Sequence, residues 1–153
     1  MSVPYKRILV PLDGSELAKQ ALPHAEDLAI RTGATIIVMQ VVQPLIEKMM
    51  VAPGYAVTIR DEHVIDPSVD EAHARLSGHA DHLYHLHINA ETMLDVGDAA
   101  GKIVDYAADH DIDLIVMSTH GYSGLTRWRH GSVTTKVLSA APCPVLVVRP
   151  TPE

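Results

Sequence analysis

Three glycines and several hydroxyl side chains separate an apolar run from an amphipathic segment in "MSTHGYSGLTRWRHGSVTTKVL", residues 117–138. The glycines are Gly121, Gly124 and Gly131. Glycine leaves the backbone N–H groups uncovered, and the first N–H groups of a helix have no partner within the helix. This pattern is typical of a cradle for phosphate groups. A glycine-rich turn in which Ser132 only caps the helix is the alternative interpretation.

The glycine segment matches neither of the two common phosphate-binding motifs. The chain contains no G-x-x-x-x-G-K-[ST] and no G-x-G-x-x-G. The sequence "GSVT" at 131–134 opens the amphipathic part, where Ser132 and Thr134 add hydroxyl groups to the free backbone N–H groups. The phosphate hypothesis therefore rests on the glycines and on the start of a helix.

A second candidate, Asp13, follows the apolar run "ILVPL". Its carboxylate can accept hydrogen bonds from a ribose hydroxyl or an adenine amine, whereas the alternative is a turn residue before the helix cap Ser15. "PLDG", "QVVQP" and "STHG" each follow an apolar run that reads as a strand. If these strands are parallel, the three sequences meet at one edge of a sheet.

The apolar pattern alternates between buried strands and amphipathic helices. Strands are expected at 7–13, 34–42, 87–94, 113–117 and 145–149. Helices are expected at 15–33, with a kink at Pro23, and at 67–86, 98–110 and 132–141. The connection at 43–66 has no sustained period, and a connection of this length is usually functional or mobile.

This alternation predicts one α/β domain over residues 1–153, an open parallel five-stranded sheet with helices on both faces. In such sheets ligands bind beyond the carboxyl ends of the strands, where the strand order reverses. Asp13 and the glycine segment would then border one site.

Composition excludes several classes of protein. The formal charge of −7 argues against a nucleic-acid partner. The single cysteine, Cys143, excludes an internal disulfide and is expected to be a buried structural thiol. No apolar run reaches about 18 residues and no signal segment precedes the first strand, so we expect a cytoplasmic protein without a membrane partner.

Other polar clusters give weaker indications. His79, His82 and His85 are spaced by three along one expected helix, and we expect them to face solvent rather than a metal. A basic cluster at 127–130 could contact phosphates or a partner, and the alternative is a solvated loop anchored by Trp128. No nucleophile is placed beside a base, so no catalytic residue is assigned and enzymatic activity stays open.

Three segments resemble the universal stress protein family: "ILVPLDGS", "DLIVMSTHGYSGLTRWRHGSVTTKVL" and "APCPVLVV". They occur in the family's order and span nearly the whole chain. Nucleotide-binding members carry G-x-x-G, nine residues, then G-[ST]. Here Ser118 stands in place of the first glycine, while Gly121, Gly131 and Ser132 match.

The resemblance implies a Rossmann-like sheet in the order 3-2-1-4-5 that binds ATP with Mg²⁺. Asp13 would hold the ribose or base, Pro11 and Val41 would line the adenine pocket, and the region after the fourth strand would border the nucleotide. The residues implied there are Met117, Ser118, His120 and Gly121. Those implied for the phosphates are Gly131, Ser132, Val133 and Thr134. The resemblance also implies a homodimer through the last strand, Val145–Val148, which reads independently as an apolar edge.

The leading hypothesis is a small cytoplasmic ATP-binding protein of stress response or signalling, which acts as a dimer with nucleotide-dependent partner choice. A dimeric interaction module that binds no nucleotide, because Ser118 closes the pocket, is the first alternative. A slow ATPase is the second.

Overall fold

The computed structural model describes residues 4–42, 67–119 and 132–151. Its strands are β1 (Arg7–Leu12), β2 (Thr35–Val42), β3 (Ala90–Val96), β4 (Leu114–Ser118) and β5 (Val145–Val148). Its helices are α1 (Glu16–Lys19), α2 (Leu22–Thr32), α4 (Pro67–His85), α5 (Ala99–Asp109) and α6 (Ser132–Ala140). No helix in these three ranges is both long and apolar enough to cross a membrane.

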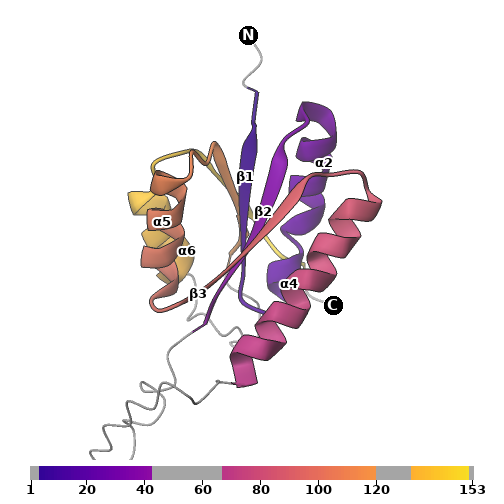
Figure 1. The fold of residues 1–153 in the computed structure, drawn as a ribbon. Coiled ribbons are helices and arrows are strands. Elements are labelled where there is room, and N and C mark those ends of the chain that lie inside the picture. The colour runs from indigo at the N-terminus through magenta and orange to yellow at the C-terminus, as the bar shows by residue number, and fades with distance from the viewer. Residues whose placement is uncertain (1–3, 43–66, 120–131, 152–153) are drawn as a thin grey trace, which may run out of the picture.

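The five strands form one parallel sheet in the order β3-β2-β1-β4-β5. Helices α2 and α4 lie on one side of this sheet, and α5 and α6 lie on the other (Figure 1). The predicted fold class and strand order are thereby confirmed. Strand β1 pairs with both β2 and β4, so the strand order reverses at its carboxyl end, immediately before Asp13.

Each face of the sheet carries its own aliphatic core because the central strands are buried on both sides. Alternate residues of β1 belong to different cores: Ile8 and Val10 pack with α1, α2 and α4, whereas Leu9 packs with α5 and α6. Side chains alternate along a strand, so the continuous apolar run of β1 serves both cores. This burial fixes the positions of the strand ends.

The first helical region differs from the kinked helix expected at 15–33. The structure has two helices, with a break after Lys19 and with Pro23 in the first turn of α2. Proline has no N–H to donate and its ring clashes with the carbonyl four residues before it, here that of Lys19. The helix therefore ends before the proline, which is well tolerated in a first turn. Gly33 ends α2 as expected, with φ +76°.

The third strand begins three residues later than the expected start at residue 87. The backbone first completes the end of α4, where Ile88 N donates to the Leu83 carbonyl at 3.0 Å. His87 takes a left-handed conformation with φ +58° in this turn. The expected cap at Asp98 is confirmed, since its carboxylate accepts from Gly101 N at 2.9 Å.

Histidines of α4 do not all face solvent. His79 is half-buried, which contradicts the expectation, while His82 and His85 are exposed and His82 Nε2 lies 2.9 Å from Glu26 Oε1. Burial is the main cause that lowers the pKa of His79 below its ordinary value of 6.5, and the charge of Lys19 adds to it. Within the part of the chain that the structure describes, no three His, Cys, Asp or Glu side chains form a group suited to a metal ion.

His79 makes the stability of the protein depend on pH. Its pKa is lower in the folded state than in the unfolded state. As the pH falls below 6.5, His79 is therefore protonated in the unfolded chain before it is protonated in the folded protein. The contribution of His79 to the stability is present in full above pH 6.5, and that contribution alone is lost as the pH falls through the folded pKa. We expect His79→Gln to reduce this loss, measured as the free energy of unfolding by urea at a series of pH values. His85→Gln, an exposed site on the same helix, is the control; equal pH dependence in all three proteins would contradict the assignment.

Cys143 is half-buried rather than fully buried, because it lies in the turn just before the edge strand β5. It packs at the margin of the core under α5 and α6. Burial, with a smaller contribution from Asp113, raises the pKa of its thiol above 9.0. The residue is therefore mostly a neutral thiol at physiological pH.

Candidate functional site

Asp13 lies at the carboxyl end of β1 and is only 3% exposed. Its Oδ1 accepts two hydrogen bonds from Ser15, one from the backbone N at 2.8 Å and one from Oγ at 2.6 Å. No described residue donates to its second oxygen, Oδ2. One oxygen therefore fixes the turn, and the other is free to accept a hydrogen bond from a ligand.

Ser15 joins this turn to α1. Its Oγ donates to Asp13 and also accepts from Ala18 N at 3.1 Å, as the N-cap of α1. The sequence predicts Ser15 as a cap and Asp13 as either a ligand or a turn residue. The structure shows that Asp13 does hold the turn, with one oxygen only.

Ser118 and Thr134 link the end of β4 to the start of α6. Ser118 Oγ donates to the carbonyls of Leu17, at 3.1 Å, and Ala18, at 3.3 Å. Thr134 Oγ1, which is buried, donates to the Ser118 carbonyl at 3.3 Å. Hydrogen bonds thus connect the Asp13 turn, α1, the end of β4 and the first turn of α6.

The apolar candidates lie on the sheet face that α5 and α6 cover. Val41 and Met117 belong to that core, Val133 packs against it, and Pro11 faces the same side as Leu9, two residues before it. Met117 is only 1% exposed. Its side chain therefore belongs to the core, and a ligand at the strand end would meet its backbone.

Several predicted site residues lie outside the described residues. These are His120, Gly121 and Gly131. The basic cluster at 127–130 and the connection at 43–66 also lie outside the described residues. Ser132 begins α6, but its side chain is not among the described groups. The structure thus links Asp13 to Ser118 and Thr134 through hydrogen bonds of Ser15 and α1.

Two contacts of this region could not be predicted from the sequence. The carbonyls of Leu17 and Ala18 accept from Ser118, which lies 101 and 100 residues further along the chain. Arg75 of α4 packs against Gly14, beside Asp13. Nothing in the spacing of these residues indicates contact, because it depends on how α1 and α4 pack on the finished sheet.

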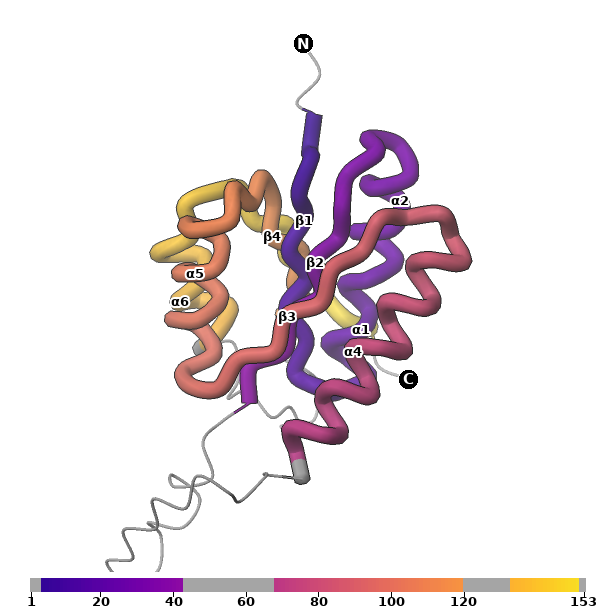
Figure 2. Tube along the Cα trace, viewed as in Figure 1, coloured from indigo at the N-terminus to yellow at the C-terminus, as the bar shows by residue number. Residues whose placement is uncertain are grey.

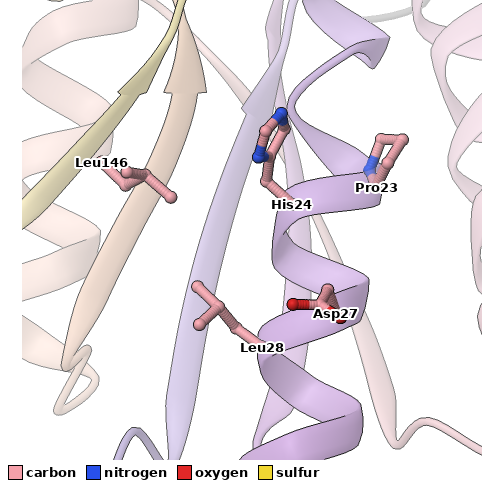
Figure 3. Close-up of a pocket in the computed structure, with 5 residues that line it drawn as sticks. All are labelled: Pro23, His24, Asp27, Leu28 and Leu146. Carbon is pink, nitrogen blue, oxygen red and sulfur yellow. The ribbon is translucent and has the colours of Figure 1, made fainter.

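A shallow groove lies elsewhere, between α2 and the edge strand β5. Pro23, His24, Asp27 and Leu28 line it from α2, and Leu146 lines it from β5 (Figure 3). None of these residues takes part in the hydrogen bonds that connect Asp13 to Thr134. The groove is therefore separate from the strand-end site.

Comparison with known proteins covers nearly the whole chain. A model of the Universal stress protein family matches residues 4–149. Among curated relatives, Universal stress protein MJ0531 of Methanocaldococcus jannaschii is 33% identical over 145 residues, which cover 95% of this chain and 82% of the relative.

Solved structures support the same likeness. MJ0577 of the same organism superimposes with a TM-score of 0.74 at 26% identity, over 99% of this chain and all of the other. A universal stress protein of Archaeoglobus fulgidus, solved in complex with dAMP, gives a TM-score of 0.66 at 23% identity, over 96% of this chain and all of the other. At this identity the second likeness concerns the fold alone.

Proposed function

The chain belongs to the universal stress protein family, and from this premise we propose that it is a small cytoplasmic ATP-binding protein of stress response or signalling. In this proposal it acts as a homodimer whose choice of protein partner depends on the bound nucleotide. The A. fulgidus protein was solved in complex with dAMP, and this supports an adenine nucleotide as the ligand in the proposal. The proposal for this chain rests on its own residues.

The observation that carries the proposal is the buried Asp13 carboxylate with one oxygen available, at the point where the strand order reverses. Hydrogen bonds connect it through α1 and Ser118 to Thr134 in the first turn of α6. A nucleoside has donors for such a carboxylate, and a phosphate suits a helix N-terminus. The two ends of a nucleotide would therefore meet complementary groups.

In the proposed complex Asp13 accepts from a ribose hydroxyl or the adenine amine, and Pro11 and Val41 lie beside the base. Met117, Ser118, His120 and Gly121 border the nucleotide after β4. The phosphates lie at Gly131, Ser132, Val133 and Thr134, where the first backbone N–H groups of α6 donate. Mg²⁺ would arrive with the phosphates and neutralise part of their charge.

The proposed dimer contact is the edge strand β5. Leu146 on this strand is 37% exposed, and among the described strands β5 pairs only with β4. An apolar edge strand with unpaired backbone groups is usually covered or paired in a stable protein. A second copy that pairs along Val145–Val148 would cover both the leucine and the free edge.

Calorimetric titration of the purified, nucleotide-stripped protein with ATP and Mg²⁺ tests the proposal. We expect saturable binding with one nucleotide per chain, and a molar mass by sedimentation equilibrium of two chains. GTP titrated in the same way is the matched control, because the proposed pocket contacts the base. We expect it to release less heat and to bind more weakly.

Other results would favour one of the alternatives. A dimer that binds no nucleotide would indicate an interaction module and contradict the ATP site. Metal-dependent ATP hydrolysis well above a slow background would instead indicate an enzyme. A monomer that binds ATP would retain the site and remove the dimer from the proposal.

A further inference from the structure

The residue after Asp13 is in contact with a helix on the opposite sheet face from α6. Gly14 has φ +87°, a conformation that residues with side chains rarely adopt. A Cβ atom added to Gly14 would lie 3.2 Å from Nη2, 3.3 Å from Cζ and 3.3 Å from Nε of Arg75. Three nearly equal distances mean that the flat face of the guanidinium, not its edge, lies against the glycine.

This contact joins α4 to the turn that carries Asp13, and helices α1 and α4 lie side by side at this end of the sheet (Figure 2). On one side, Asp13 Oδ1 holds Ser15 by two hydrogen bonds. On the other side, the guanidinium of Arg75 covers Gly14. The turn that carries Asp13 is therefore contacted on both sides.

Burial of the Arg75 side chain is unfavourable if its only role is to fill space. Its Nε and Nη2 are buried and find no hydrogen-bond acceptor among the residues that the structure describes, and Nη1 lies 3.7 Å from Glu71 Oε2. Burying unpaired N–H groups is unfavourable, and an aliphatic side chain would fill the same space without that cost. The guanidinium group is instead planar and rigid, and it packs against the backbone of Gly14, which carries no side chain.

We propose that Arg75 is a positioning residue for the nucleotide site, which acts through Gly14 to orient the Asp13 carboxylate toward the ligand. This inference rests on the proposed ATP-binding function. It adds a residue on α4, outside the glycine segment and on the other sheet face, on which nucleotide affinity depends.

A double-mutant cycle tests the inference by ATP titration. Arg75→Met keeps the length of the side chain and removes the planar group, and we expect about a 10-fold loss of ATP affinity. In the Asp13→Asn background the same change is expected to cost less than about 2-fold, because the carboxylate that Arg75 orients is already absent. Arg31→Met, at an exposed arginine of α2 paired with Asp27, is the matched control and leaves the affinity unchanged.

The conservative variant Arg75→Lys retains charge but not the flat face, and we expect it to bind ATP as weakly as Arg75→Met. Thermal unfolding of each variant shows that it is folded during the titration. Unchanged affinity in both Arg75 variants, or an equal loss in the presence and absence of the Asp13 carboxylate, would overturn the inference and leave the proposed function intact. Absence of ATP binding in the unmodified protein would overturn the proposed function, and the inference with it.

Discussion

Replacing Asp13 by asparagine is expected to lower the affinity for ATP by about 10- to 100-fold while the protein remains folded. Asparagine retains a side-chain oxygen that can accept from Ser15 N, as Oδ1 of Asp13 does at 2.8 Å. With its oxygen toward Ser15, asparagine places an NH2 group where Asp13 has its free oxygen, and this group donates hydrogen bonds but does not accept them. A hydrogen bond to a charged group contributes about 1.5–3 kcal/mol, which corresponds to this range of affinity.

The matched control for this prediction is Asp98→Asn. Asp98 also follows a strand and caps a helix, since its Oδ2 accepts from Gly101 N at 2.9 Å, and asparagine is an equally good N-cap. Calorimetric titration of both variants with ATP and Mg²⁺ gives the comparison, and urea unfolding confirms that both are folded. Equal ATP affinity in Asp13→Asn and the unmodified protein would remove Asp13 from the site.

The sheet could be predicted from the sequence because its signal is local. Runs such as "RILVPL" and "TIIVMQVV" are apolar throughout, as strands covered on both faces must be, and such strands are parallel with helices between them. Asp13 follows from the same reasoning, since a polar residue directly after such a strand lies at the edge where ligands bind. The strand order came from the family resemblance, not from the apolar pattern.

The deviations arose where packing decides between local alternatives. The apolar period continues through Pro23, so the sequence predicted a kink where the structure breaks the helix. His79 occupies a half-buried position of α4 because α1 packs beside it, which the spacing of histidines on one helix does not reveal. The contact between Arg75 and Gly14 depends on the same packing.

Replacing Ser118 by glycine restores the glycine of the family motif, yet we expect it to destabilise the protein rather than to improve binding. Ser118 Oγ donates to the carbonyls of Leu17 and Ala18, so the hydroxyl joins β4 to α1. The loss of this hydrogen bond, whose one proton is shared between the two carbonyls, together with a glycine at the end of a strand, is expected to lower the free energy of unfolding by about 2 kcal/mol. Ser118→Ala keeps the Cβ atom and is expected to lose about half as much.

The direction of this side chain also decides between the leading proposal and the nucleotide-free interaction module. Ser118 Oγ is held against α1, whereas Met117, the residue before it, belongs to the core under α5 and α6. The serine side chain therefore lies on the sheet face away from Val41, which also belongs to that core. We expect ATP affinity in Ser118→Gly to stay within about 2-fold of the unmodified protein, in titrations of both variants. A gain of 10-fold or more in the glycine variant would mean that Ser118 obstructs the pocket, and would favour the interaction module.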